Sequence, residues 1–155
     1  MMMAQFTVNL NVNGDDCSVS VEPQTTLLGV LRDQLGYNGV KAGCEEGDCG
    51  ACAVLIDGKP VTSCLVLTAS AEDKKITTIE GLADGWQLHP IQQAFVDNHG
   101  MQCGYCTPGA IIAAKGLLDE NPKPSEGEVR QALSGNLCRC GSYGKMVKSV
   151  LAAAG

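Results

Sequence analysis

Alternation of apolar and polar residues marks the start of the chain. Every second residue from Phe6 to Val12 is apolar, and the alternation resumes at Val19 and Val21. Between the two segments, Asn13-Gly14 has the composition of a tight turn. The pattern therefore predicts a β-hairpin over residues 5–22.

A short helix is predicted directly after this hairpin. Thr25 or Thr26 can act as its N-cap, and the helix should cover Leu27 to Leu35. Gly36 follows at the position where a glycine commonly ends a helix.

Three shorter apolar segments predict the rest of a sheet. Residues 53–56 read as one strand, Asp57-Gly58 as a tight turn and residues 61–64 as the return strand. Residues 76–79 are the candidate last strand. With the hairpin, these pieces predict a small mixed sheet accompanied by one helix.

The apolar period changes to that of helices in the second half. Residues 80–88, with two glycines, are interpreted as a linker, and we expect Trp86 to pack between the halves or else against a partner. Helices are then predicted over Leu88–His99, from Pro108 through Leu118, from Ser125 with Glu128 as a capping box, and over residues 143–154. Short loops between them predict a compact bundle.

Composition limits the classes of protein that fit. The 155 residues suit one domain or two small ones, and 45% hydrophobic with 18% charged residues is ordinary for a globular protein. A net charge of −6 argues against nucleic acid or an anionic membrane as partner. Lys115 interrupts the most apolar stretch, so we expect no membrane span.

The chain contains nine cysteines, a high count. Eight of them fall into two groups, at 44/49/52/64 and at 103/106/138/140. The odd number, the grouping and an N-terminus without the features of an export signal favour metal ligands in a reducing compartment over disulfides. Cys17 stands apart, and we expect it to be a small half-buried residue.

The first group has the C-x4-C-x2-C spacing of plant-type 2Fe–2S sites, with Cys64 as the fourth thiolate. Gly43, Gly47 and Gly50 lie among these cysteines, where a loop that curls around a cluster needs positive φ angles and close approach. Loop amides can then donate to the sulfurs. Structural zinc is the alternative, but this spacing favours iron–sulfur.

The second group combines Cys103-x2-Cys106 with Cys138-x-Cys140, and each pair precedes a predicted helix. Helix N-termini carry free amides and a positive dipole end, which suits an anionic cluster. The spacing alone also fits four-thiolate zinc. A second iron–sulfur site beside the first would make the chain an electron relay.

Three segments together carry a resemblance. They are Gly-Cys-Glu-Glu-Gly-Asp-Cys-Gly-Ala-Cys at 43–52, Gln-Cys-Gly-Tyr-Cys-Thr-Pro-Gly at 102–109 and Gly-Asn-Leu-Cys-Arg-Cys at 135–140. In this order, across nearly the whole chain, they resemble the iron–sulfur subunit of the xanthine oxidase family of molybdenum hydroxylases. The resemblance implies an α+β chain, with a β-grasp, plant-ferredoxin-like domain over residues 1–80 and a C-terminal four-helix bundle over residues 81–155.

The resemblance also implies one 2Fe–2S cluster in each domain. The cluster nearer a flavin or other acceptor would be held by Cys44, Cys49, Cys52 and Cys64. The cluster nearer the molybdenum cofactor would be held by Cys103, Cys106, Cys138 and Cys140. Gln102 would hydrogen-bond the molybdopterin, and Cys140 would lie beside its amino group. Without the resemblance, Gln102 reads as a loop amide bonded to its own backbone.

The implied function is electron transfer without substrate chemistry on this chain. Molybdopterin–molybdenum and FAD are expected on a large and a medium partner subunit, in a heterotrimer or a dimer of heterotrimers. The implied location is cytoplasmic, with periplasmic export alongside a partner as the alternative. Many family members continue Thr-Gly-Tyr after the last cysteine, whereas this chain has Gly141-Ser142-Tyr143, so the resemblance leaves the subfamily open.

Three other classes of protein fit the sequence less well. A free ferredoxin would need only one cluster and no bundle, and a zinc-stabilised interaction module would be colourless. A Rieske-type centre would need His89 and His99 within cysteine motifs, which the sequence does not provide. Both histidines are therefore expected to be solvated or to cap helices.

Overall fold

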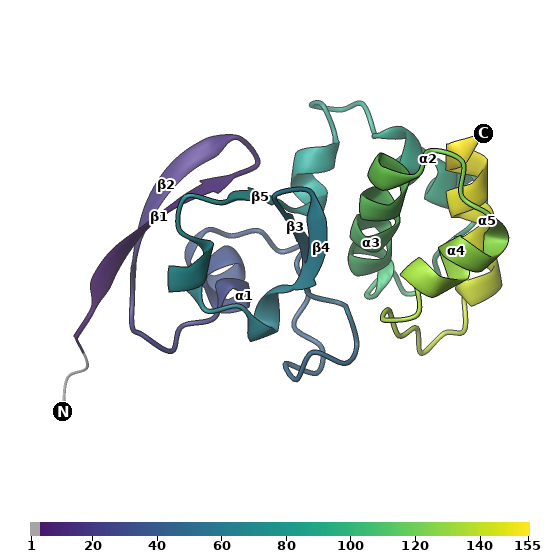
Figure 1. Ribbon diagram of the computed structural model, residues 1–155. Helices are drawn as coiled ribbons and strands as arrows, with labels where there is room; N and C mark the ends of the chain where they lie inside the picture. The colour runs from purple at the N-terminus through teal and green to yellow at the C-terminus, as the bar shows by residue number, and fades with distance from the viewer. Residues whose placement is uncertain (1–3) are drawn as a thin grey trace.

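The structure is a computed structural model that describes residues 4–155. Its elements form a sheet-containing half and a helical half that lie side by side (Figure 1). Residues 1–3 lie outside the described residues. They belong to the predicted 1–80 domain and to the N-terminal stretch that was interpreted as lacking an export signal.

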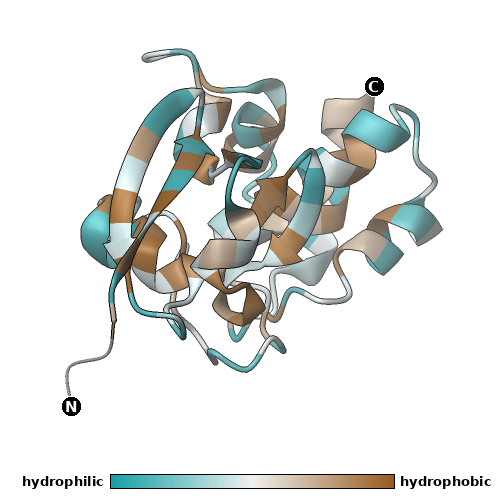
Figure 2. Ribbon diagram, turned by 60° about the vertical axis from the view of Figure 1, so that its left-hand side comes forward, coloured by the Kyte–Doolittle hydropathy of each residue, from teal (hydrophilic) through white to brown (hydrophobic). Residues whose placement is uncertain are grey.

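The N-terminal hairpin is confirmed. Strand β1 (Phe6–Val12) pairs antiparallel with β2 (Asp15–Val21). Asn13 and Gly14 connect them with φ angles of 56° and 92°, as a tight two-residue hairpin turn requires. Hydrophobic and hydrophilic residues alternate along this ribbon (Figure 2). The apolar face is therefore buried, and the polar face meets solvent.

Three further strands complete a five-stranded sheet. They are β3 (Ala53–Ile56), β4 (Lys59–Thr62) and β5 (Lys75–Thr77), and the strand order is β2-β1-β5-β3-β4. Strands β1 and β5 are parallel and the other neighbours antiparallel, so the predicted mixed sheet is confirmed.

The return strand ends earlier than expected. We predicted residues 61–64, but β4 ends at Thr62 and Cys64 lies in a short 3₁₀ helix, η2 (Ser63–Leu65). The hydroxyl of buried Ser63 donates to the Cys52 carbonyl at 2.7 Å. The chain therefore turns out of the ladder beside Cys52, which brings Cys64 to the first cysteine loop.

The helix after the hairpin has two parts. Helix α1 (Leu27–Gly29) runs into a π-helical segment, η1 (Val30–Gln34), instead of one α-helix over Leu27 to Leu35. Thr26 is the N-cap, because its hydroxyl accepts from the Gly29 amide at 3.3 Å. Gly36 follows with a φ of +78°, as expected for the residue that ends the helix. The leucines of both parts join the sheet residues in one buried core.

The second half contains the longer helices. They are α2 (Pro90–Asp97), α3 (Thr107–Glu120), α4 (Glu126–Ala132) and α5 (Tyr143–Ala154). Ile91, Phe95, Val129, Met146 and Val150 are among the residues of their shared core. The predicted capping box of α4 is confirmed, since Ser125 and Glu128 bond reciprocally at the helix start.

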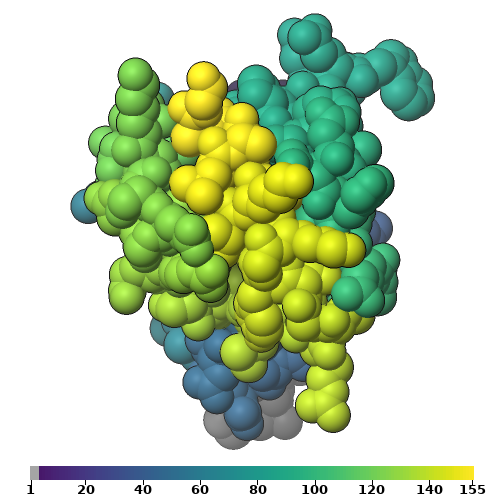
Figure 3. Space-filling view, turned by 90° about the vertical axis from the view of Figure 1, so that its right-hand side faces the viewer, coloured from purple at the N-terminus to yellow at the C-terminus, as the bar shows by residue number. Residues whose placement is uncertain are grey.

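The segment between the halves begins with the short helix η4 (Ile79–Leu82), directly after β5. Another short helix, η3 (Thr68–Ala71), lies before β5 and belongs to the first half. Beyond η4 the chain projects from the body of the molecule before α2 begins (Figure 3). Trp86 lies on this projection and is fully exposed, at 103%. The expectation that it packs between the halves was wrong, because the linker carries it outward.

The halves nevertheless pack closely. Ala53 and Leu55 on β3 form a small buried cluster with Ile112 on α3. Gly116 faces Pro60 so closely that an added Cβ would lie 2.7 Å from the proline ring. Among residues 4–155, no helix is long and apolar enough to cross a membrane.

Candidate metal centres

The first cysteine loop brings its thiols together in pairs. The Cys44 amide donates to Cys49 Sγ, and the Cys49 amide donates to Cys44 Sγ, both at 3.4 Å. The Cys52 and Cys64 side chains are neighbours, since the Cys52 thiol contributes to the raised pKa of Cys64. Cys52 and Cys64 are buried, whereas Cys44 and Cys49 are half-buried.

Glycines make this loop possible, as the sequence predicted. Gly47 and Gly50 have φ angles of +87° and +66°. Gly43 serves differently, since an added Cβ there would lie 2.7 Å from Cys49 Sγ. Glu45, although not a glycine, also takes a positive φ of 59°, and the amide of Glu46 then donates to Cys44 Sγ at 3.4 Å. The curl therefore directs backbone donors at the sulfur.

The two ends of this site differ electrostatically. Amide donors from Glu46 and Cys49 lower the pKa of Cys44 to about 7. Burial, reinforced by the neighbouring Cys52 thiol, raises the pKa of Cys64 to about 11. Amide donors favour the thiolate that a metal requires, whereas a buried thiolate needs a cation nearby to be stable.

The second cysteine group is assembled from two helix starts. Cys106 is the N-cap of α3, and Cys138 and Cys140 lie just before α5. The Cys140 thiol contributes to the lowered pKa of Cys103, and the Cys138 thiol to the raised pKa of Cys106, so these side chains are neighbours. The four cysteines are neighbours in cross-segment pairs, which brings the two helix starts together. That these four thiols close one site stays a prediction.

In the second group, too, burial raises the pKa of the thiols and amide donors lower it. Burial raises the pKa of Cys106 to about 12, and the Cys138 thiol adds to this rise. The Tyr105 amide and the Cys140 thiol lower the pKa of Cys103. For Cys138, burial opposes ionisation, but the Ser142 amide and further donors outweigh it and lower the pKa. The Ser142 amide lies 3.4 Å from Cys138 Sγ.

Gln102 lies at the exposed edge of this second group. Its side-chain Nε2 donates to the Cys140 carbonyl at 3.1 Å, across to the other cysteine segment. Cys103 is exposed beside it, while Cys138 is buried. The contact differs from the amide bonded to its own local backbone that we expected without the resemblance. It fixes the Gln102 amide next to Cys140.

Hydrogen bonds also tie the two cysteine regions to each other. The Leu137 amide donates to the Cys49 carbonyl at 3.0 Å, and the buried Asn136 side chain donates to the Gly50 carbonyl at 3.1 Å. The Tyr105 hydroxyl donates to the Ala42 carbonyl. Sequence reasoning assigned no such roles to these residues. The one available signal was their position inside the quoted cysteine motifs.

Glycine also permits this docking. A Cβ at Gly109, in the first turn of α3 after its N-cap cysteine, would lie 2.2 Å from the Gly50 carbonyl oxygen. No larger residue fits without moving α3 off the first loop. The Cys-Thr-Pro-Gly segment therefore positions the second cysteine group against the first.

Within residues 4–155, no three or more His, Cys, Asp or Glu side chains are arranged to hold a single metal ion. The thiols meet instead two by two, with amide N–H groups directed at several sulfurs. In a 2Fe–2S cluster, four protein ligands are shared between two irons. The donor set therefore fits such a cluster at each site.

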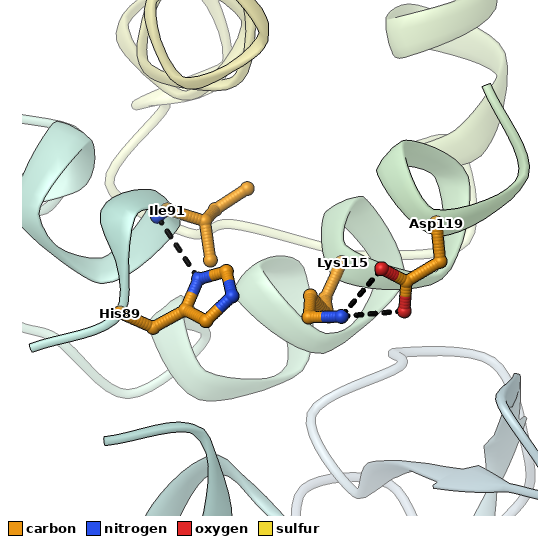
Figure 4. Close-up of polar contacts among 4 residues, drawn as sticks. All are labelled: His89, Ile91, Lys115 and Asp119. Atoms are coloured by element: carbon orange, nitrogen blue, oxygen red, sulfur yellow. Dashed lines mark hydrogen bonds and ion pairs between the residues drawn. The ribbon is translucent and has the colours of Figure 1, made fainter. Parts of the chain in front are cut away.

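The histidines serve the fold. His89 caps α2, because its Nδ1 accepts from the Ile91 amide at 3.2 Å (Figure 4). Burial, followed by the charge of Lys115, lowers the pKa of His89. Lys115 itself is paired with Asp119 in the same view. His99 follows α2 with a positive φ of 54°. The capping role expected of His89 is confirmed.

Cys17 is half-buried in the hairpin, as predicted. Its Sγ donates to the Leu10 carbonyl at 3.6 Å, between the two paired strands. It belongs to the strand core and to neither cysteine group.

Comparison with known proteins agrees with this geometry. Residues 10–83 match the family model described as "2Fe-2S iron-sulfur cluster binding domain", and residues 78–151 match "[2Fe-2S] binding domain". The chain is 47% identical to the nicotinate dehydrogenase small FeS subunit of Eubacterium barkeri, covering 96% of this chain and 94% of that one. It is also 47% identical to the nicotine 6-hydroxylase small subunit of Paenarthrobacter nicotinovorans, and that match covers 96% of this chain and 89% of the other.

Solved structures show the same fold. Quinoline 2-oxidoreductase from Pseudomonas putida 86 contains a chain that superposes with a TM-score of 0.93 at 43% identity, covering 97% of this chain and 94% of that one. The aldehyde oxidoreductase of Desulfovibrio gigas superposes with a TM-score of 0.91 at 45% identity. The match covers 96% of this chain but 17% of that longer chain.

These likenesses extend over both cysteine groups, so they define a class of protein with two 2Fe–2S binding domains on an α+β, ferredoxin-like chain. The chain belongs to the iron–sulfur small subunits of the molybdenum hydroxylases, the xanthine oxidase family.

Proposed function

We propose that this chain relays electrons through two 2Fe–2S clusters, from a molybdopterin-bearing partner to a flavin or other acceptor. One cluster belongs to a domain at residues 1–80 and the other to a four-helix bundle at residues 81–155. The first ligand set is Cys44, Cys49, Cys52 and Cys64, and the second is Cys103, Cys106, Cys138 and Cys140. The observation that carries this proposal is the gathering of the eight cysteines in neighbouring pairs, with backbone amides donating to Cys44, Cys49 and Cys138.

The contacts suggest how the ligands divide between irons. Cys44 with Cys49, and Cys52 with Cys64, would each serve one iron of the first cluster. Cys103 with Cys140, and Cys106 with Cys138, would do so in the second. When bound, each cluster accepts and releases a single electron. The residues of this chain hold the sulfurs in place and supply their hydrogen-bond donors.

The hydrogen bond from Leu137 to Cys49 supports a direct route between the two ligand sets. Cys49 is a proposed ligand of the first cluster, and Leu137 is bonded to Cys138, a proposed ligand of the second. Only covalent bonds and this one hydrogen bond separate the two sulfurs along the route. Electronic coupling falls off more slowly through bonds than across gaps, so this contact favours transfer.

The second group would face the molybdopterin partner. Gln102 and Cys103 are exposed while Cys106 and Cys138 are more buried, so the group opens to the surface at the Gln102 edge. We propose that Gln102 hydrogen-bonds the pterin there, and that Cys140 lies beside its amino group. The Gln102 amide keeps free hydrogen-bonding capacity for this contact, since it uses one N–H on Cys140.

Partner subunits would cover further surfaces. The exposed Trp86 on the projecting segment is suited to pack against one of them, which was the second expectation for this residue. We propose that a large subunit holds molybdopterin–molybdenum and that a medium one holds FAD, in a heterotrimer or a dimer of heterotrimers. A cytoplasmic location stays a prediction, supported by the nine thiols that are all free.

The names of similar proteins include nicotinate dehydrogenase, quinoline 2-oxidoreductase and aldehyde oxidoreductase. Closely similar chains therefore serve enzymes with different substrates. We propose that the substrate of this complex is selected on a partner subunit, and that this chain sets only the path and potentials of the electrons.

The test is the iron and sulfide content of the purified full chain, with visible absorption and EPR spectra after reduction. About four irons and four sulfides with two distinct reduced signals are expected from two 2Fe–2S clusters. A colourless chain containing zinc would overturn the proposal. About two irons would limit it to one cysteine group.

A further inference from the structure

Ser142 lies two residues after Cys140, at the start of α5, and its side-chain oxygen has an unusual environment. The residue is 2% exposed, and its Oγ has no hydrogen-bond partner. Among residues 4–155, one other buried side-chain oxygen shares this state, Oγ1 of Thr107, which follows Cys106. Leaving a buried hydroxyl unpaired costs about 1–3 kcal/mol. Both cases adjoin the second cysteine group.

The ordinary role of a serine at this position is helix capping, and Ser142 does not perform it. It is the N-cap residue of α5, yet its side chain makes no capping hydrogen bond. Ser125, by contrast, caps α4 through its hydroxyl. The Ser142 hydroxyl is therefore free for another acceptor.

The candidate acceptor that the same residue already contacts is the Cys138 sulfur. The Ser142 amide already donates to Cys138 Sγ at 3.4 Å. The Ser142 hydroxyl belongs to the same residue as this amide, and it is buried at the helix start with no partner of its own. A thiolate is a much stronger acceptor than a thiol, so loss of the Cys138 proton on metal binding would supply the missing partner.

We propose that the Ser142 hydroxyl donates a hydrogen bond to the Cys138 sulfur and raises the reduction potential of the second cluster. This inference rests on the proposed function, since it requires a cluster at that site. The added electron makes the sulfur more negative, so a donor stabilises the reduced form more than the oxidised form. The proton stays on Ser142 throughout, and only one electron is gained.

Ser142 is thus a positioning residue that tunes potential. In the first loop, the hydrogen bonds to Cys44 and Cys49 come from backbone amides, which substitution of side chains leaves in place. At Cys138 the amide donor is observed, and the proposed second donor is a side chain, the Ser142 hydroxyl. Substitution of this one side chain should therefore shift one cluster and leave the other unchanged.

The experiment is an anaerobic redox titration, followed by EPR, of the full chain loaded with iron and sulfide. Ser142→Ala should lower the midpoint potential of one signal by up to ~59 mV. For one electron, this corresponds to a change of about tenfold in the equilibrium constant for reduction. Ser142→Thr keeps the hydroxyl and should restore most of the shift. Ser149→Ala is the matched control, because Ser149 is buried on the same helix and bonds the Lys145 carbonyl at 2.8 Å.

Each outcome decides one question. Two signals with unchanged potentials in Ser142→Ala would overturn this inference and leave the proposed function intact. Absence of both iron–sulfur signals in the unsubstituted chain would overturn the proposed function itself, and absence of the second cluster's signal alone would overturn this inference. If Ser142→Ala fails to load, Ser142→Gly takes its place with the same expected shift. Failure of both to load would show a structural role and contradict tuning.

Discussion

The backbone amide of Leu137 donates a hydrogen bond to the carbonyl oxygen of Cys49 at 3.0 Å. Cys49 lies in the first cysteine loop, and Leu137 directly precedes Cys138 in the second group. The two candidate sites therefore share a backbone contact as well as a packed interface. This arrangement ties the spacing of the two ligand sets to the docking of the two halves.

Removal of this donor should slow electron transfer between the sites. Leu137→Pro deletes the amide hydrogen, whereas Leu137→Ala keeps it and trims a side chain that is more than half exposed. We expect a slower transfer rate after rapid photoreduction in the proline variant and an unchanged rate in the alanine variant. Equal rates in two variants with full iron content would exclude this hydrogen bond from the route.

Substitution of single cysteines should separate the two clusters. Cys49→Ser should abolish one reduced EPR signal and leave the other, because its sulfur pairs with Cys44 alone in the first loop. Cys103→Ser should abolish the other signal. Cys17→Ser is the control, since Cys17 belongs to the hairpin core. Retention of both signals in Cys49→Ser would refute the ligand assignment.

Local structure was largely predictable from this sequence, because local patterns determine it. The Asn13-Gly14 turn, the Thr26 cap and the Ser125–Glu128 capping box all depend on residues within a few positions of each other. The cysteine spacing indicated an iron–sulfur site for the first group, whereas for the second group the spacing alone also fitted zinc. Element ends were less certain, since tertiary contacts such as Ser63 with Cys52 ended a strand early.

The docking of the halves was not predictable in the same way. Asn136 reaches Gly50 across 86 positions, and no periodicity records such a contact. Trp86 was expected to pack between the halves or against a partner, and the linker projects it into solvent. Such features depend on how two cores meet, or on surfaces that a partner would cover.

Loss of the Asn136 side chain should loosen this docking. Asn136 is 6% exposed, and its amide donates to the buried Gly50 carbonyl. The Ala53 amide also donates to that carbonyl, at 3.2 Å, so Asn136→Ala removes one of its two donors. The loss should cost about 0.5–1.5 kcal/mol of unfolding free energy, the usual net contribution of one hydrogen bond. Thermal or denaturant unfolding of the iron-loaded chain measures this. Asn38→Ala, at an exposed asparagine, should change the unfolding free energy little; an equal loss there would contradict the assignment.

Gln102→Ala should weaken union with the molybdopterin partner. The substitution removes an exposed amide that is held beside Cys140, and the cysteines themselves remain. We expect a lower yield of complex in co-purification and lower turnover, with both EPR signals retained. Gln93→Ala, an exposed glutamine on α2, is the matched control. Assembly and turnover equal to the control would argue against a pterin contact.

The first loop should also reveal itself by its pH dependence before iron is added. Amide donors lower the pKa of Cys44 to about 7 from an ordinary value of 9.0, so its thiolate predominates above about pH 7. Because the folded pKa is the lower one, ionisation of Cys44 stabilises the loop fully above pH 9, and this contribution is lost as the pH falls through 7.

Alkylation of the iron-free full chain, followed by peptide mass mapping, measures this directly. Half-maximal reactivity of Cys44 is expected near pH 7, whereas Cys106, with a pKa of about 12, should stay protected over the same range. At pH 7 this lowered pKa makes the Cys44 thiolate about fifty-fold more abundant than in the chain unfolded by denaturant. If Cys44 instead titrates near 9 in both forms, the amide donors are assembled only when the cluster binds.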